Sequence, residues 1–239
     1  VTRAMRALDG VIIVVCAVEG IMPQTETVIR QALKEKVKPV LFINKVDRLI
    51  AELQVTPEDM MQRFGKIITE VNKLISRMVP DEFKKDWMVD AQAGTVAFGS
   101  AYHNWATSIP FMAKKKVNFK QIYDFMENEQ KKELAQAAPL HEVLLDMIVE
   151  KLPSANTAQK YRIPHIWRGE AEEEIGQSMI HAKPDGDSAF MVTKVVLDPH
   201  AGEIAVGRLF SGSIKKGDQM YVAGMPNANR VQSVGMFVG

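Results

Sequence analysis

The chain has 239 residues and an ordinary composition, with 46% hydrophobic and 25% charged side chains. Its net charge of +1 argues neither for nor against a nucleic-acid partner, so any RNA contact would have to be local. The single cysteine, Cys16, excludes an internal disulfide and fits a reducing compartment. No apolar stretch approaches the roughly 20 residues that a membrane helix needs. We therefore expect a cytoplasmic protein of one or two domains with no membrane partner.

The first part of the chain alternates between strand and helix patterns. Val11–Val18 is a continuous apolar run rich in β-branched residues, which is typical of strands covered on both faces. Thr25–Lys36 carries apolar side chains at helical spacing, and Pro39–Ile43 is a second short apolar run. A strand, a helix and a strand of these lengths predict a βαβ unit in a parallel sheet flanked by helices.

The same pattern continues over the next hundred residues. Pro57–Val79 has the periodicity of a long helix, Thr95–Phe98 is a third strand candidate, and Pro139–Leu152 is a further helix. The segment 111–138 is polar and charged, and we interpret it as a mostly helical, exposed insertion. Residues 1–155 are therefore predicted to form one α/β domain.

The pattern changes in the last third of the chain. Residues 156–187 are polar and rich in Pro, Gly and acidic side chains, which predicts an irregular linker. Short β-prone runs follow at Phe190–Leu197, Gly202–Phe210 and Gln219–Val222, separated by turn residues. Several short strands with regular turns predict that residues 188–239 begin a small antiparallel β-barrel domain.

Two short motifs follow predicted strands and point to a nucleotide. Asn44-Lys45-Val46-Asp47 comes directly after the second strand, and Ser100-Ala101 ends the third. Ligands of open α/β sheets bind just outside the carboxyl ends of the strands, so the two loops can converge on one ligand. A carboxylate at Asp47 can accept from the ring N–H and the exocyclic amine of guanine. Adenine would leave that charge unpaired, and sites of this kind discriminate strongly.

The remaining members of the two motifs have supporting roles in this hypothesis. The aliphatic stem of Lys45 would cover the flat face of the base while its ammonium stays in water. Asn44 would brace the loop, and Val46 would be a packing spacer. Ala101 would donate its backbone N–H to the guanine carbonyl oxygen, with Ser100 shaping the turn.

A simpler interpretation of the tetrapeptide stays open. Asn-Lys after a strand is common turn chemistry, and Asp47 could cap the next helix. The tetrapeptide alone favours this interpretation, whereas its place after a strand together with Ser100-Ala101 favours the nucleotide site. The five histidines lack metal-ligand spacing and there is no second cysteine, so we expect no metal ligand in this chain.

Longer stretches carry a family resemblance that spans nearly the whole chain. Thr2–Gly10 followed by Val18–Thr27 resembles the stretch after the second switch in ribosomal translocation GTPases. Asn44–Arg48 and Phe98–Trp105 are similar to the archaeal elongation factor 2 family, and Gly207–Gly212 resembles its barrel. The resemblance implies a three-layer P-loop-type GTPase domain, incomplete at its N-terminus, followed by an antiparallel β-barrel domain.

The resemblance also implies an activity and its partners. The parent protein would be a GTPase that binds GTP or GDP with Mg²⁺ and moves tRNAs and mRNA through the ribosome. It would act as a monomer that contacts rRNA and ribosomal proteins directly, and tRNA and mRNA indirectly. The Tyr102–Trp105 segment and the position of the polar insertion after Ser100-Ala101 disfavour elongation factor G or a release GTPase. A complete, non-catalytic interaction module with a degenerate GTPase fold is the alternative from another class.

Segments that GTP hydrolysis needs do not occur in the sequence. There is no G-x-x-x-x-G-K-[ST] phosphate loop and no D-x-x-G-H segment, so no catalytic residue can be assigned. The chain opens inside a predicted helix, Val1–Leu8, and we expect the missing segments and the Mg²⁺ ligands upstream of it. Very weak GDP binding and no GTPase activity are therefore expected for the isolated chain.

Overall fold

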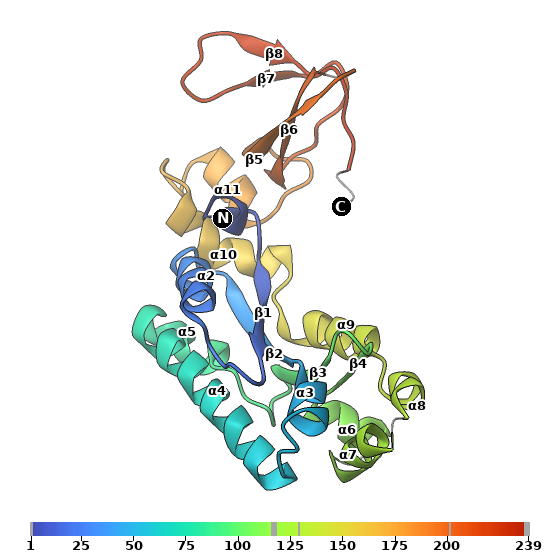
Figure 1. The fold of residues 1–239 in the computed structure, drawn as a ribbon. Helices are drawn as coiled ribbons and strands as arrows, with labels where there is room; N and C mark the ends of the chain where they lie inside the picture. The colour runs from blue at the N-terminus through green and yellow to red at the C-terminus, as the bar shows by residue number, and fades with distance from the viewer. Residues whose placement is uncertain (1, 116–118, 129, 201, 237–239) are drawn as a thin grey trace. The chain divides into compact units, whose positions relative to one another are not determined.

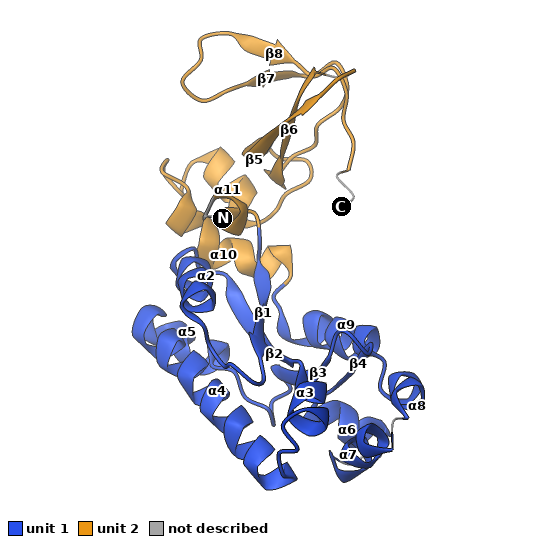
Figure 2. Cartoon of the chain, in the orientation of Figure 1, with its two compact units in different colours: residues 1–2, 8–153 blue, residues 3–7, 154–239 orange. Residues whose placement is uncertain are grey.

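The computed structural model describes residues 2–115, 119–128, 130–200 and 202–236 (Figure 1). Parts of the predicted helix at 1–8, the insertion at 111–138 and the barrel segment at 188–239 therefore lie outside the described residues. The chain forms two compact units (Figure 2). Unit 1 contains residues 1–2 and 8–153, and unit 2 contains residues 3–7 and 154–239.

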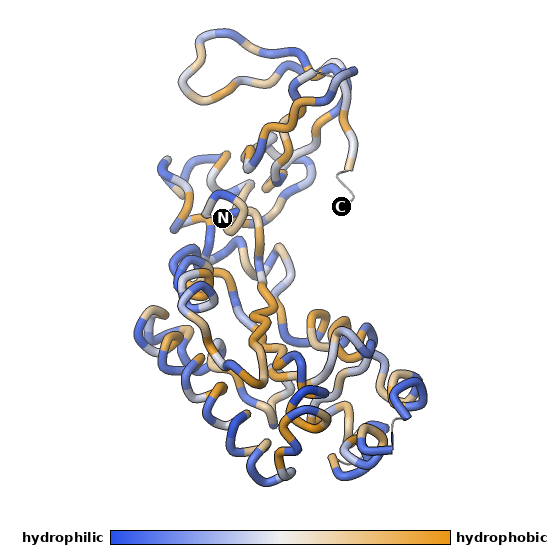
Figure 3. The backbone as a smooth tube through the Cα atoms, in the orientation of Figure 1, coloured by the Kyte–Doolittle hydropathy of each residue, from blue (hydrophilic) through white to orange (hydrophobic). Residues whose placement is uncertain are grey.

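Unit 1 is built on a four-stranded mixed sheet with strand order β1-β2-β3-β4. The first three strands are parallel, and the fourth is antiparallel to the third. The strands are β1 (Gly10–Cys16), β2 (Lys38–Asn44), β3 (Val96–Ser100) and β4 (Trp105–Thr107). Figure 3 shows that apolar chain gathers along these strands in the middle of the unit. The predicted α/β class is confirmed.

The outer strand differs from its prediction. The run Val11–Val18 predicts a strand covered on both faces, but β1 lies at the sheet edge, paired only with β2 among the described residues. Val14 is consequently 53% exposed, whereas Leu41 and Ile43 of β2 are fully buried. Continuous hydrophobicity predicted the strand itself and could not reveal how many neighbours the strand has in this chain.

Helices cover both faces of the sheet. In Figure 1, α2 (Pro23–Lys34), α4 (Pro57–Met78) and α5 (Asp81–Trp87) lie on one side, and α9 (Leu140–Lys151) lies on the other. The short helix α3 (Val46–Ala51) begins directly after β2. Within the segment expected to be an insertion, the chain forms α6 (Ile109–Lys115), α7 (Phe119–Glu127) and α8 (Lys131–Ala137).

The long helix α4 anchors the core of unit 1. It begins at Pro57 because the Thr56 hydroxyl accepts the backbone N–H of Asp59 at 3.2 Å, which caps the first turn. Phe64, 2% exposed, stacks on Phe98 of β3 with ring centroids 4.7 Å apart. The apolar face of α4 thus packs on β3 and supports the end of that strand at Ser100.

The described residues of unit 2 form three helices and two separate hairpins. The helices are α1 (Thr2–Arg6), α10 (Ala155–Ile166) and α11 (Glu174–Ile180). The strands are β5 (Ala189–Asp198), β6 (Gly202–Ser211), β7 (Gln219–Tyr221) and β8 (Ala228–Arg230). The pairs β5-β6 and β7-β8 are antiparallel, but no closed barrel exists within residues 154–200 and 202–236.

The prediction of an irregular segment at 156–187 is wrong, because α10 and α11 occupy much of it. The reason lies in the buried face of α10, where Gln159 and Arg162 are 1% and 0% exposed. Polar residues on the inward face remove the apolar periodicity that marks a helix. Composition alone therefore suggested a linker where the chain is folded.

Two arginines hold the last turn of α1 in unit 2. The Arg162 guanidinium donates to the carbonyl oxygens of Met5 and Arg6, both at 3.0 Å. Arg208 of β6 donates to the carbonyl of Ala7 at 3.0 Å and to the Gln159 side-chain oxygen at 2.8 Å. The final carbonyls of a helix have no partner within it and carry partial negative charge, so two cations satisfy this end well.

None of the described helices is both long and apolar enough to cross a bilayer.

Candidate nucleotide site

The two predicted loops leave the same edge of the sheet. β2 ends at Asn44 and β3 ends at Ser100, and the parallel register pairs Ile43 with Phe98. Because the two strands run in the same direction, their carboxyl ends lie side by side. This topology places Asn44-Lys45-Val46-Asp47 next to Ser100-Ala101, at the kind of edge where α/β proteins bind ligands.

A single side chain joins the two loops. Asn44 Oδ1 accepts the backbone N–H of Lys45 at 2.8 Å and the backbone N–H of Ala101 at 2.9 Å. Ala101 was predicted to donate this N–H to guanine, and that remains a prediction. In the structure the N–H is donated to Asn44, which had been expected only to brace its own loop.

Asp47 has one carboxylate oxygen without a donor. Its Oδ1 is buried and has no hydrogen-bond partner among the described residues, and its Oδ2 lies 3.8 Å from His103 Nε2. The side chain is 15% exposed. A buried acceptor left unpaired costs about 1–3 kcal/mol, and Asp47 Oδ1 is such an acceptor among the described residues.

The alternative role of Asp47 as a helix cap does not match the geometry. The cap residue of α3 is Lys45, with no side-chain hydrogen bond at the cap, and Asp47 lies inside the first turn. A carboxylate in this turn is favoured by the helix dipole but does not close the helix end.

Lys45 has a strained backbone. Its φ of 64° and ψ of 34° lie in the left-handed region, and its side chain is exposed. This conformation costs a residue with a Cβ about 1–2 kcal/mol, and such strain clusters at functional sites. The turn aims the chain from β2 into α3 and leaves the Lys45 side chain on the surface.

The strain at Lys45 predicts that one substitution raises stability while it weakens guanine binding. Asparagine tolerates the left-handed region better than lysine, so Lys45→Asn should raise the free energy of unfolding by about 0.5–1 kcal/mol. The same change removes the stem proposed to cover the base and should weaken guanine binding. Denaturant unfolding and nucleotide titration of one sample measure both effects.

Gln54 provides a matched control for this experiment. It also has a positive φ, 48°, but it belongs to neither motif. Gln54→Asn should give a similar gain in stability with unchanged guanine binding. A loss of stability in Lys45→Asn would contradict the strain argument.

The other two members of the motifs are buried. Val46 and Ser100 are each 1% exposed, so neither offers a side chain to solvent. Val46 packs at the start of α3, and Ser100 Oγ accepts the backbone N–H of His103 at 3.3 Å. Ser100 thus fixes the turn after β3, which is the role expected for it.

Sequence reasoning missed two residues that shape this edge. His103 was given no role at the site, although its place just after Ala101 puts it beside Asp47. Gly99 is the second: a Cβ there would lie 2.3 Å from the backbone oxygen of Trp105. Only glycine lets β4 approach β3 this closely. Adjacency to the second motif was the available signal for both.

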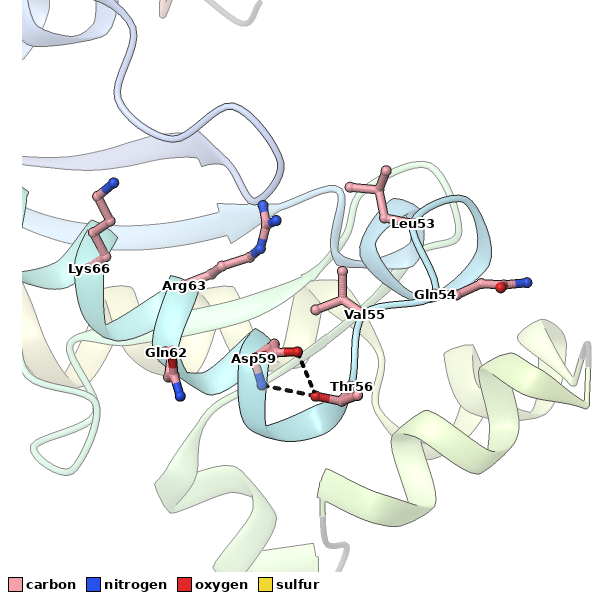
Figure 4. A pocket seen from close by; sticks show the side chains of 8 residues that line it. All are labelled: Leu53, Gln54, Val55, Thr56, Asp59, Gln62, Arg63 and Lys66. Atoms are coloured by element: carbon pink, nitrogen blue, oxygen red, sulfur yellow. Dashed lines mark hydrogen bonds between the residues drawn. The ribbon is translucent and has the colours of Figure 1, made fainter.

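A hollow in unit 1 is lined by other residues. It has a volume of about 500 Å³ and contains no residue of the two motifs (Figure 4). It is formed by the chain after α3 and the first turns of α4, with the lining Leu53, Gln54, Val55, Thr56, Asp59, Gln62, Arg63 and Lys66. Among the described residues, no three His, Cys, Asp or Glu side chains are placed to hold a metal ion.

Comparisons with known proteins show the family of this chain. Over all 239 residues the chain is 61% identical to elongation factor 2 of Methanococcus maripaludis and of Picrophilus torridus, and 56% identical to that of Methanocaldococcus jannaschii. It spans about a third of the length of these relatives: 33%, 32% and 33%. The resemblance read from the motifs is confirmed. Residues 1–154 match the family model of the elongation factor Tu GTP binding domain, and the chain therefore belongs to that family.

Proposed function

We propose that this chain is part of a GTP-dependent translocation factor, and that it holds the guanine-recognition half of the GTP site. The full protein would move tRNAs and mRNA through the ribosome during elongation. The observation that carries the proposal is the convergence of the two loops, with Asn44 bonded to Ala101 beside an orphaned oxygen of Asp47. The family match and the elongation factor 2 relatives support it.

The chemistry of base recognition follows from the donors and acceptors at the edge. Asp47 would accept the ring N–H and the exocyclic amine of guanine, and the two oxygens of an ionised carboxylate suit this pair. Asn44 already accepts two backbone N–H groups through Oδ1, so its amide N–H groups are left to donate to the base. Ala101 N–H would reach the guanine carbonyl oxygen only by sharing its bond to Asn44. Lys45 would cover the flat face of the base.

Hydrolysis would need groups that this sequence lacks. Phosphoryl transfer depends on cradling the β- and γ-phosphates and on Mg²⁺ that bridges them. The proposed phosphate and Mg²⁺ ligands therefore belong to the part of the full-length protein that this chain does not span. Within this chain the proposed contribution is to bind and orient the guanine base.

The rest of the chain has a place in the proposal. Residues 1–155 would be the GTPase domain with its insertion near 111–138, residues 156–187 the connection, and residues 188–239 the start of the antiparallel barrel. Apolar side chains of β5, such as Val195 at 55% and Leu197 at 78% exposed, suit a sheet that further strands complete. The factor would act in the cytoplasm as a monomer on the ribosome, with indirect contacts to tRNA and mRNA.

Asp47→Asn tests the assignment. An amide cannot accept both guanine donors and places its own N–H groups against them, so GDP affinity should fall about tenfold or more. Ligand-observed NMR suits the weak binding expected of the isolated chain, and ADP measures the base preference. The wild-type chain should prefer GDP, and Asp47→Asn should lose that preference.

Asp81→Asn is the matched control, because Asp81 also lies in the first turn of a helix, α5. It should leave the preference for GDP unchanged. Equal affinities of the wild-type chain for GDP and ADP would favour the alternative of a non-catalytic interaction module.

A further inference from the structure

His103 is held rigidly beside the proposed base-recognising carboxylate. Its backbone N–H is bonded to Ser100 Oγ, and the turn behind it is closed by Asn104 N–H donating to Ala101 O at 3.4 Å. Asn104 O accepts the N–H of Leu140 at the start of α9, at 3.1 Å. With a side chain only 20% exposed, His103 keeps its imidazole 3.8 Å from Asp47 Oδ2. The contact is thus built by the fold of the loop.

Asp47 is the one carboxylate within ion-pair distance of His103 among the described residues. The next residue of α3, Arg48, is held by Glu52, with Nε and Oε2 2.8 Å apart. Tyr102 meets the His103 ring edge-on at 4.8 Å. The helices that contact these elements carry further ionisable groups: Lys120, Tyr123, Asp124 and Glu127 on α7, and His141, Glu142, Asp146, Glu150 and Lys151 on α9. Of these, Glu142 is paired with Lys115 at 3.3 Å.

We propose that His103 is a proton-dependent competitor of guanine for the Asp47 carboxylate. The inference rests on the proposed function of Asp47 and adds a regulating residue to the same site. A protonated imidazole attracts the carboxylate and offers it an N–H donor, so the charge that would attract the guanine N–H groups is already paired. A neutral imidazole leaves Asp47 with its unpaired oxygen and ready for the base.

The sign of the effect follows from linkage. Histidine takes up its proton between about pH 8 and pH 5, while an ordinary aspartate stays ionised over most of this range. Guanine binding to Asp47 would expel the proton from His103, so affinity is highest above this window and falls as pH decreases through it. We expect the competition to change affinity about tenfold, which corresponds to about 1.4 kcal/mol.

The experiment measures guanosine binding to the 239-residue chain at about pH 8 and about pH 5.5 by ligand-observed NMR. Guanosine is the probe because the phosphates of GDP themselves titrate near pH 6. Wild-type affinity should be roughly tenfold weaker at the lower pH. His103→Gln, which keeps a polar side chain and cannot be protonated, should bind equally at both pH values.

His141→Gln is the matched control and should keep the wild-type dependence, because His141 is an exposed histidine on α9. His103→Asn serves as the second variant if His103→Gln unfolds. A pH-independent wild type, or a His103 variant that keeps the wild-type dependence, would overturn the inference. A wild-type chain that fails to prefer guanosine over adenosine at high pH would instead overturn the proposed function.

Discussion

Replacing Arg162 with methionine is expected to lower the free energy of unfolding of unit 2 by about 3 kcal/mol. Arg162 is fully buried and donates to the carbonyl oxygens of Met5 and Arg6. Methionine fills a similar volume but has no donor, so the buried carbonyl of Met5 and the part-buried carbonyl of Arg6 both lose these bonds. Each unpaired acceptor costs about 1–3 kcal/mol, and part of this is offset because the charge no longer has to be buried.

Denaturant unfolding measures the change in the free energy of unfolding. Hydrogen exchange resolved by peptide then shows whether the change lies in unit 2. Exchange should accelerate in α1 and α10, while β2 and β3 of unit 1 keep their protection. Arg168→Met is the matched control: Arg168 is exposed in the chain after α10, and its loss should change stability by less than about 0.5 kcal/mol. If Arg162→Met and Arg168→Met had the same free energy of unfolding, the bonds from Arg162 to α1 would add nothing to stability.

Gly99→Ala is expected to destabilise unit 1 by about 3 kcal/mol. The added methyl would lie 2.3 Å from the backbone oxygen of Trp105 and 2.7 Å from Ala106 Cα. Both are backbone atoms of β4, so the strands must separate to admit it. Because Gly99 is paired with Ala106 immediately before Ser100, the shift would also move the loop that meets Asn44. Guanine binding should therefore weaken together with stability.

The control is the same substitution at an open position. Gly65 lies in the interior of α4, and a Cβ there would meet no atom within 4 Å. Gly65→Ala should raise the free energy of unfolding by about 1 kcal/mol, because alanine restricts the unfolded chain and favours the helix. Thermal or denaturant unfolding compares the two variants directly. A destabilised Gly65→Ala or an unaffected Gly99→Ala would contradict the packing argument.

Helices and strands that depend on local periodicity were predicted well. Pro57–Val79 became α4 over Pro57–Met78, and Pro39–Ile43 became β2 over Lys38–Asn44. Apolar spacing alone determines such elements, since one face must be buried whatever the rest of the chain does. The convergence of the two motifs followed from the same patterns, because parallel strands bring their carboxyl ends to one edge.

Features that depend on distant contacts were not predictable. α10 was taken for irregular chain because its buried face carries Arg162, whose partners are carbonyls more than 150 residues away. The bond between Asn44 and Ala101 depends on the distance between two loops, which no motif specifies. The contact of His103 with Asp47 likewise depends on the distance between two loops. In each case a polar side chain finds its partner through the fold.

The bonds from Arg162 and Arg208 to the end of α1 have a consequence for preparing unit 2 on its own. Unit 2 is discontinuous, because residues 3–7 belong with 154–239 although the chain between them forms another body. A recombinant segment that starts at Ser154 would carry Arg162 and Arg208 without the carbonyls of residues 5–7 to receive them. Excision at the apparent boundary would thus take the carbonyls of Met5 and Arg6 from Arg162 and the carbonyl of Ala7 from Arg208. Unit 2 is better studied with its short N-terminal peptide supplied in trans or fused through a linker.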